Sequence, residues 1–311
     1  MVPTWLQRIF LVLGQQSVWA FFVLSGLVLT LQMSSPSLDY RTYLPRRLLR
    51  LYLPTIAAVV FAYATIAFIP RHLPTGNAWI DSHPSSVSLN GVLSDLSLIN
   101  GTSGNLMPIW SLKWEVLFSL VLPALFFFLA KSPIWTIAIW PIVGSMGIGE
   151  VAFYGAMFIS GTFLGLYWGA IAKYLESRRF EANWILVFSF LLTCCSNLIQ
   201  AFFTFPFSGN LGILLGQLGI PLFVATLPFS SFRVVFESRF MQWLGQISFS
   251  LYLVHEPVLI AAVRLSHNNM FASFIGAVAA LGAASLFHRF IEVRAHSLSR
   301  SLGKYEKPMD S

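Results

Sequence analysis

Long uncharged apolar runs dominate the chain and determine the architecture that it predicts. No Asp, Glu, Lys or Arg occurs within residues 9–38, 51–70, 132–149 or 151–172. About 20 consecutive, mostly apolar residues are enough for one helix to cross a bilayer. Each of these runs therefore predicts at least one membrane-spanning helix.

Further apolar stretches extend this pattern. The uncharged residues 182–232 are long enough for two helices, and a turn-forming cluster at 205–210 divides them. Three other apolar segments carry isolated ionisable groups, at about 112–130, 244–264 and 271–289. We therefore expect nine spans in an all-α polytopic bundle that forms one membrane domain over residues 1–311.

The composition excludes most other classes of protein. The chain is 56% apolar and 10% charged, with a mean hydropathy of +0.73, whereas soluble domains contain about 25% charged residues. An ordinary soluble protein and a nucleic-acid-binding module are therefore excluded. The two cysteines, Cys194 and Cys195, are neighbours, and no metal-ligand spacing occurs. We expect neither a disulfide framework nor a metal site.

Basic residues between the apolar runs predict the orientation. The cluster at 41–50 is placed in the cytoplasm because inner loops carry an excess of Lys and Arg. Alternating nine spans from there puts 15 of the 19 basic residues inside and leaves four outside, namely Arg8, Arg71, Lys113 and Arg264. The C-terminus, with a basic tail at about 292–311, is then cytosolic, and the N-terminus is outside. An outward N-terminus predicts one more helix upstream, and we expect the plasma or inner membrane.

The connection at about 70–111 lies outside in this topology. It is rich in Pro, Gly, Ser and Asn, and loops of this length are usually functional or disordered.

One polar stripe lies within the predicted span at 244–264. Ser248, Tyr252 and His255 are spaced i, i+4 and i+7, so they share one helix face, and Glu256 adjoins them. An ionisable side chain at a span centre costs about 2.5 to 3.5 kcal/mol. The stripe therefore predicts either a reaction centre in a wet cavity, with His255 and Tyr252 catalytic and Ser248 lining the substrate, or a hydrogen-bonded packing cluster.

A second polar group opens the span at 112–130. Trp110 and Ser111 precede Glu115, and Ser111 and Glu115 lie on one helix face. Glu115 either pairs with Lys113 or Arg264, or orients a histidine or an acceptor hydroxyl. Because carboxylates within a membrane usually mark a site, we take Glu115 as a catalytic candidate and Trp110 and Ser111 as lining the substrate.

A third motif lies at the cytosolic start of the second span. Arg46 and Arg50 are one turn apart, with Arg47 beside them. These arginines anchor the topology and also predict a binding site for a phosphorylated donor, because guanidinium groups match phosphate oxygens.

Other residues are expected to be structural. The glycines at 161, 165 and 169, and those at 212 and 216, predict close helix packing. The remaining histidines show no partner spacing and are expected to be solvated: His72, His83, His267, His288 and His296.

Five motifs in order resemble the membrane acyltransferase family 3. They are residues 21–26 (Phe-Phe-Val-Leu-Ser-Gly), 46–54 (Arg-Arg-x2-Arg-x3-Pro), 110–115 (Trp-Ser-Leu-x2-Glu), 247–255 (Ile-Ser-Phe-Ser-Leu-Tyr-Leu-x-His) and 290–292 (Phe-Ile-Glu). The resemblance implies a ten-helix bundle that moves an acyl group, often acetyl, from cytosolic acyl-CoA to a hydroxyl of a carbohydrate, lipid or small metabolite.

The resemblance also implies roles for particular residues. Arg46, Arg47 and Arg50 would hold acyl-CoA, which is a co-substrate rather than a bound cofactor. Ser25, in the first motif, would line the substrate. Members of the family begin with a helix that carries an arginine and a histidine regarded as catalytic, ahead of the first motif here, and this again predicts an upstream helix.

Two alternatives remain open at this point. A transporter or lipid flippase would use the same polar stripe as a translocation path, and a relative without the first helix would be catalytically inactive. The expected partners are the acyl-CoA donor, a hydroxylated acceptor and membrane lipid, without nucleic acid.

Overall fold

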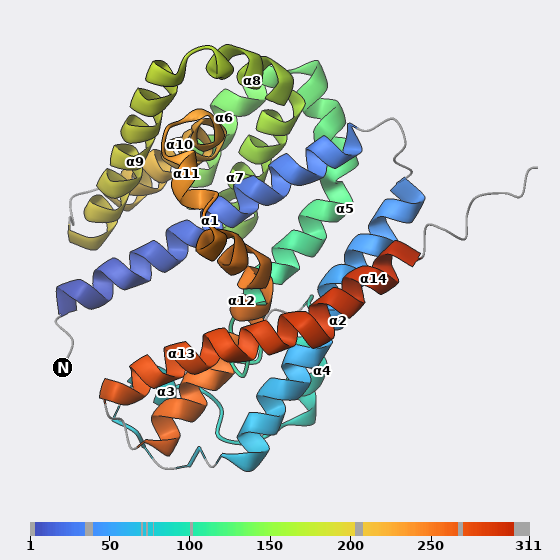
Figure 1. The fold of residues 1–311 in the computed structure, drawn as a ribbon, viewed down its shortest axis with the longest axis vertical. Helices are drawn as coiled ribbons and strands as arrows, with labels where there is room; N and C mark the ends of the chain where they lie inside the picture. The colour runs from blue at the N-terminus through green and yellow to red at the C-terminus, as the bar shows by residue number, and fades with distance from the viewer. Residues whose placement is uncertain are drawn as a thin grey trace, which may run out of the picture. The chain divides into compact units, whose positions relative to one another are not determined.

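The computed structural model describes residues 4–34, 40–69, 71–72, 74–76, 78–99, 102–202, 208–266 and 270–301. Over these residues the secondary structure is helical, without a β-strand (Figure 1). The predicted all-α class is confirmed. Helices follow from the apolar runs because a bilayer offers no hydrogen-bond partner, so each backbone group is satisfied within its own helix.

The chain divides into two compact units, and each is built from two stretches of sequence. Unit 1 comprises Met1–Leu38 and Leu117–Ser238, and unit 2 comprises Asp39–Val116 and Arg239–Ser311. Helix α5 (Ile109–Lys131) contributes its first two turns to unit 2 and the remainder to unit 1. The single membrane domain expected from the sequence stays a prediction.

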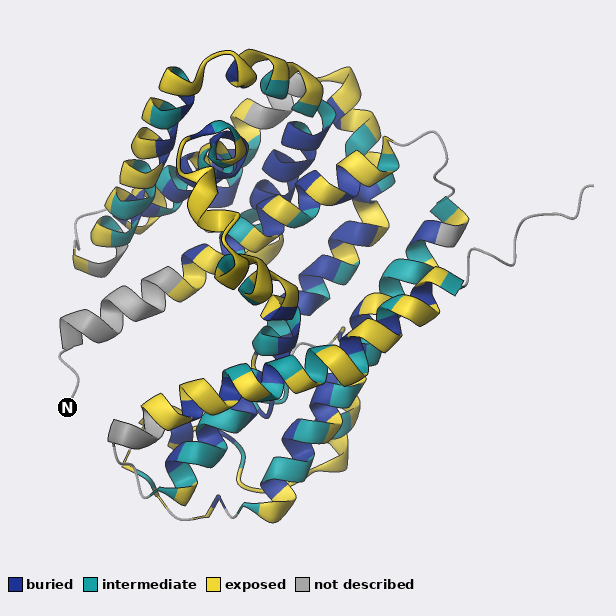
Figure 2. Ribbon diagram, viewed as in Figure 1, coloured by how far each residue is buried: buried dark blue, intermediate teal, exposed yellow. Residues whose placement is uncertain are grey.

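In unit 1, helix α1 packs against α7, α9 and α10, and α10 packs along α9. The helices of unit 1 are α1 (Thr4–Met33), α6 (Pro133–Ser145), α7 (Glu150–Leu166), α8 (Trp168–Glu176), α9 (Arg179–Phe202), α10 (Ser208–Thr226) and α11 (Arg233–Phe236), with a 3-10 turn η1 (Leu227–Phe229). The middle of α7 is buried on nearly all sides, as the dark ribbon in Figure 2 shows.

Glycines bring α1 and α7 into backbone contact. A Cβ on Gly161 would overlap the carbonyl oxygen of Val23, and one on Gly26 would overlap that of Phe158. A Cβ on Gly165 would lie against Thr30, whereas one on Gly169 would meet no atom of the described chain within 4 Å. The predicted packing role is therefore confirmed for Gly161 and Gly165 and does not extend to Gly169.

In unit 2, α12 packs along α13 and against α2, and α14 packs against α2 (Figure 1). The elements are α2 (Tyr40–Phe68), α3 (Ala78–Asp81), α4 (Leu89–Ser97), the start of α5, α12 (Arg239–Leu265), α13 (Met270–Phe287), a π-helical segment η2 (His288–Glu292) and α14 (Val293–Ser301).

The long connection before α5 is folded into unit 2. Helix α4 begins at the N-cap Ser88, whose hydroxyl accepts the Gly91 N–H, and ends at Leu98 in the left-handed conformation with φ of 53°. Leu98 and Leu106 are fully buried in a core with Ala58, Ala62 and other residues of α2 and α12. The described part of this connection is therefore a packed element of the unit.

This connection also reaches deep along α2. The Tyr52 hydroxyl donates to the Ser97 carbonyl at 3.2 Å. Phe68, the last residue of α2, lies 16 residues after Tyr52, which is about 24 Å of helix at 1.5 Å per residue. The buried Asp95 carboxylate accepts the Ser103 N–H at 2.6 Å and the Tyr63 hydroxyl at 3.1 Å, so the inserted backbone turn is satisfied by polar partners.

Fewer helices meet the length for a span than the nine expected. Among the described residues seven are long and apolar enough, or eight if α7 and α8, which bend by 69°, form one span. The difference is α6, which has 13 residues, or about 20 Å, against a hydrocarbon core of about 30 Å. The sequence predicted a helix through residue 149, but α6 ends at Ser145. Gly147 and Gly149, with φ of 70° and 134°, follow it in conformations that a helix does not adopt.

The predicted sides of the membrane stay a prediction. Within the expected basic tail, residues 292–301 belong to η2 and α14, and residues 302–311 lie outside the described part of the chain.

Candidate functional site

Two hydroxyls from α12 and α5 meet in unit 2. Ser111 Oγ and Tyr252 OH lie 2.7 Å apart, and they lie 3.2 Å and 3.0 Å from the carbonyl oxygen of Pro108. Each hydroxyl has one hydrogen, so one donates to the carbonyl and the other donates to its neighbour. The structure therefore brings together two residues that the sequence had selected separately.

His255, one turn further along α12, has a defined tautomer when neutral. Its Nδ1 lies 2.9 Å from the Tyr252 carbonyl oxygen and 3.0 Å from that of Leu251. Because a carbonyl oxygen only accepts, Nδ1 carries the hydrogen and Nε2 carries the lone pair. The ring is half-buried and lies beside the Tyr252 ring, with 6.2 Å between the centroids. His255 is therefore arranged to accept a proton at Nε2.

Ser248, Trp110 and Ser25 were also expected to line the substrate. Ser248 is exposed and donates to the carbonyl of Gly245 in its own helix at 2.8 Å, so no bond joins it to the Tyr252 hydroxyl. Trp110 is half-buried and directly precedes Ser111 at the start of α5. Ser25 lies in α1 and belongs to unit 1. Their roles as substrate-lining residues stay predictions.

Glu115 is buried and forms an ion pair with Arg47. Glu115 Oε1 lies 2.5 Å from a terminal nitrogen of Arg47, and Glu115 is 4% exposed. The partners expected from the sequence were wrong, because Lys113 lies over the Trp114 ring at 4.3 Å and Arg264 pairs with Asp81 at 3.6 Å. Glu115 follows Ser111 by one turn, about 6 Å along α5, so the ion pair lies close to the two hydroxyls.

The three arginines of α2 differ in their surroundings. Arg47 is engaged with Glu115, whereas Arg50 is exposed. Arg46 is half-buried, and its Nε has no hydrogen-bond partner among the described residues. Its carbonyl accepts the Ser299 hydroxyl of α14 at 3.0 Å. Arg46 and Arg50 are the two of the three best placed to bind an anionic ligand.

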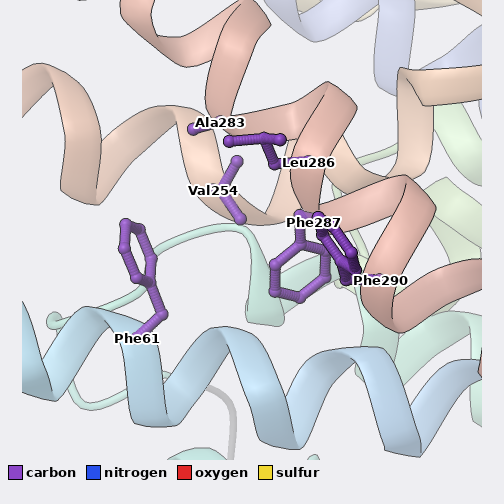
Figure 3. Close-up of a pocket in the computed structure, with 6 residues that line it drawn as sticks. All are labelled: Phe61, Val254, Ala283, Leu286, Phe287 and Phe290. Carbon is purple, nitrogen blue, oxygen red and sulfur yellow. The ribbon is translucent and has the colours of Figure 1, made fainter.

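An apolar groove lies on another face of the same helices. It has a volume of about 270 Å³ and is lined by Phe61, Val254, Ala283, Leu286, Phe287 and Phe290 (Figure 3). All six side chains are apolar, so the groove contributes no proton acceptor and no charge to the site. No group of three or more potential metal ligands occurs in the described part of the chain.

Comparison with known families identifies the family of the chain. A family model described as an acyltransferase domain matches residues 2–289. The chain belongs to acyltransferase family 3. Neither a curated protein nor a solved structure matches it. The match covers parts of both units. Because the family is one of acyltransferases, the activity of this multi-pass membrane protein is acyl transfer.

The acyltransferase also contains buried groups that sequence reasoning missed. His83, expected to be solvated, is 3% exposed in its side chain and lies 2.8 Å from Glu256, which is 2% exposed. The other oxygen of Glu256 accepts the Met107 N–H at 2.6 Å. The available signal was Glu256 itself, a carboxylate within a predicted span, but its partner lies 173 residues away.

A second buried carboxylate, Glu292, lies in η2, which packs against α12. Glu292 accepts the Ser250 hydroxyl at 2.5 Å and pairs with His288 at 3.0 Å. His296 lies 3.8 Å from its other oxygen. The expectation that His288 and His296 are simply solvated was wrong, whereas His72 is exposed as expected and His267 lies outside the described residues. The motif at 290–292 had marked this position without predicting its partners.

Charged residues after α2 hold the connection between α2 and α5. The Thr75 and Gly76 backbone N–H groups donate to Asp81 and, with the Thr75 hydroxyl and Arg264, hold the pKa of Asp81 below its ordinary value. Burial lowers the pKa of the Arg71 guanidinium, and the nearby positive charge of Arg264 lowers it further.

Proposed function

We propose that this acyltransferase moves an acyl group, acetyl first among the candidates, from acyl-CoA to a hydroxyl of a carbohydrate, lipid or small metabolite. The observation that carries the proposal is the geometry of His255. Two backbone carbonyls hold its Nδ1–H, and this leaves a lone pair on Nε2 of a ring that lies 6.2 Å, centroid to centroid, from the ring of Tyr252. General-base catalysis needs a side chain with a free lone pair that can accept the proton of the acceptor hydroxyl.

The proposed reaction balances with these groups alone. The acceptor O–H proton moves to His255 Nε2 while the acceptor oxygen forms a bond to the thioester carbonyl carbon. The carbon–sulfur bond then breaks, and the CoA thiolate takes the proton from the imidazolium. Negative charge develops on the carbonyl oxygen between these steps, and the hydroxyl of the Tyr252–Ser111 pair that donates to its neighbour would turn to donate to this oxygen instead.

The donor is proposed to bind at the arginine end of α2. Arg46 and Arg50 offer guanidinium groups to the phosphates of acyl-CoA. Arg47 contacts Glu115, which is one helical turn from Ser111. This series of contacts supports a donor that is held at Arg46 and Arg50 and extends its thioester toward Tyr252, with Glu115 fixing the spacing rather than transferring the proton.

The acceptor is proposed to enter from the side of the outer connection. Trp110 and Ser111 follow this connection directly, and they would line the acceptor with Tyr252. The cytosolic C-terminus and the plasma or inner membrane remain part of this proposal, because they rest on the distribution of Lys and Arg.

The test is acyl transfer by the purified protein in lipid nanodiscs. We expect thiol release from acetyl-CoA that increases when hydroxylated acceptors are added, with the label recovered as an ester. The same protein in proteoliposomes serves as the comparison for the transporter alternative. Movement of lipid or solute without thiol release or ester formation would contradict the proposal.

A further inference from the structure

Two side chains of α12 hold the backbone that leads into α5. The Tyr252 hydroxyl lies 3.0 Å from the Pro108 carbonyl oxygen, and the Glu256 Oε2 lies 2.6 Å from the Met107 nitrogen. Tyr252 and Glu256 are one turn apart on α12, with His255 between them in sequence. The two contacts therefore hold two consecutive residues of the connection, Met107 and Pro108, against α12.

The hydrogen-bond partners of Glu256 define its chemical state. His83 Nδ1 lies 2.8 Å from the Trp79 carbonyl oxygen, so Nδ1 carries a hydrogen and donates it. His83 Nε2 and Glu256 Oε1 lie 2.8 Å apart and share one further proton. The other Glu256 oxygen accepts the Met107 N–H. Both carboxylate oxygens of Glu256 thus have protein partners. In His255, by contrast, the two backbone carbonyls contact Nδ1 and not Nε2.

We propose that Glu256 is a positioning residue of the reaction centre. By holding the Met107 amide, it fixes the Pro108 carbonyl, on which the Ser111 and Tyr252 hydroxyls are aligned. His83 holds Glu256 in place and ties it to α3 through Trp79. This role rests on the proposed function, since it matters for catalysis only if the Tyr252 and His255 site carries out the transfer.

The physical basis is the burial of the pair. Glu256 and His83 side chains are 2% and 3% exposed, so no water competes for their hydrogen bonds, and such charge-assisted bonds are about twice as strong as neutral ones. Removal of Glu256 frees the Met107 amide and lets Pro108 move. A displacement of about 1 Å at a reaction centre lowers the rate by about 100-fold.

The substitutions Glu256→Gln and Glu256→Ala separate positioning from proton transfer. A glutamine keeps both contacts, because its amide oxygen accepts from Met107 and its amide nitrogen donates to neutral His83, but it cannot exchange a proton. We expect Glu256→Gln to retain most of kcat and Glu256→Ala to lose about 100-fold, with the KM for acetyl-CoA unchanged in both. Glu237→Ala removes an exposed carboxylate of unit 1 and serves as the matched control.

Hydrogen exchange of the 102–110 segment, measured by mass spectrometry in nanodiscs, provides a readout without activity. We expect slow exchange at Met107 in the wild type and in Glu256→Gln, and fast exchange in Glu256→Ala. Unchanged exchange in Glu256→Ala overturns the proposed hold of Glu256 on the Met107 amide, which we call the clamp. An inactive Glu256→Gln with slow exchange also overturns the proposal, because Glu256 then takes part in proton transfer. If Glu256→Ala does not fold, Glu256→Gln still tests the proposal, because its loss of activity would overturn the positioning role.

The two proposals fail in different ways. If the wild type shows no acyl transfer, the proposed function fails while the exchange contrast still tests the clamp. If the wild type is active and Glu256→Ala keeps full kcat, the positioning role fails and the proposed function stands.

Discussion

The two units hold their helices together by different means. In unit 1 the contact between α1 and α7 depends on Gly26, Gly161 and Gly165, at which a side chain would strike the facing helix. Its ion pairs in the described chain, such as Arg178 with Glu181, lie at exposed positions. In unit 2 four carboxylates are buried and bonded to other segments, namely Asp95, Glu115, Glu256 and Glu292.

This difference indicates where the chemistry lies. Small residues let apolar helices approach closely, and this is the usual way to stabilise a bundle in lipid. Buried ionisable groups are expensive in a membrane and are retained mainly where function needs them. We therefore propose that unit 1 acts as a scaffold and that unit 2 carries the groups that bind and transfer the acyl group.

The largest expected effect comes from breaking the Arg47–Glu115 ion pair. Arg47→Met removes the ion-pair partner of the buried Glu115, and breaking a buried ion pair in this way typically costs about 3 to 5 kcal/mol. The double variant Arg47→Met/Glu115→Leu removes both charges and is expected to recover most of the stability but not the activity. Thermal unfolding in detergent, followed by size-exclusion chromatography, measures this.

The control for that prediction lies in unit 1. Arg178→Met breaks an exposed pair with Glu181, and we expect an unchanged melting temperature because solvent screens such a pair. Equal losses from the Arg47 and Arg178 variants would remove the contrast between the units.

The next effect tests the packing of unit 1. Gly161→Ala places a methyl group against the Val23 carbonyl oxygen, which belongs to a helix backbone and cannot turn aside. We expect at least the roughly 1 to 3 kcal/mol of an overpacked core. Gly169→Ala, with open space around it, is expected to fold as the wild type does. The yield of monodisperse protein compares the two, and a normal yield for Gly161→Ala would show that α1 and α7 are not in backbone contact.

A smaller effect is expected at the donor site. Arg46→Gln and Arg50→Gln each remove one charge from the proposed acyl-CoA site, and one charge-assisted hydrogen bond is worth about 1.5 to 3 kcal/mol. We expect at least about tenfold weaker acetyl-CoA binding by calorimetry, with unchanged thermal stability. Arg239→Gln, at an exposed position in the same unit, is the control. Wild-type affinity in the Arg46 and Arg50 variants would reduce these residues to topological anchors.

The smallest effect concerns pH and the connection between α2 and α5. The Thr75 N–H lowers the pKa of Asp81 from its ordinary value of 3.8, so the carboxylate stabilises the folded loop above that value and loses this contribution as the pH falls through the lowered pKa. We expect protease cleavage within residues 74–82 to be constant from about pH 8 to pH 5 and to increase only below about pH 4. Asp81→Asn should increase cleavage at all of these pH values, and increased cleavage of the wild type already near pH 6 would contradict the prediction.

Much of the helical architecture could be predicted from the sequence. Uncharged runs predicted the helices because their length and composition are local properties, and the spacing of Gly161 and Gly165 predicted close packing. The number of spans differed at α6, which ends at Ser145, and Gly147 and Gly149 with positive φ follow it within the same uncharged run. Absence of charge alone does not show where a helix ends.

The site was predicted in its members but not in its connections. The stripe containing Tyr252 and His255 followed from helix periodicity. The pairing of Arg47 with Glu115, 68 residues apart, and of His83 with Glu256 depends on how distant segments fold together. Ser248 shares the stripe by spacing, but it bonds to its own helix, which periodicity cannot reveal.

The central claim is that His255 accepts the acceptor proton in unit 2. The most direct test compares His255→Gln with wild type in acetyl transfer, with His72→Gln, at an exposed position of the same unit, as the control. Glutamine preserves hydrogen bonding but cannot accept a proton at neutral pH. We predict a folded His255→Gln variant that binds acetyl-CoA normally and has lost transfer, while His72→Gln remains active. Transfer at the wild-type rate by His255→Gln would contradict the account and reduce His255 to a structural role.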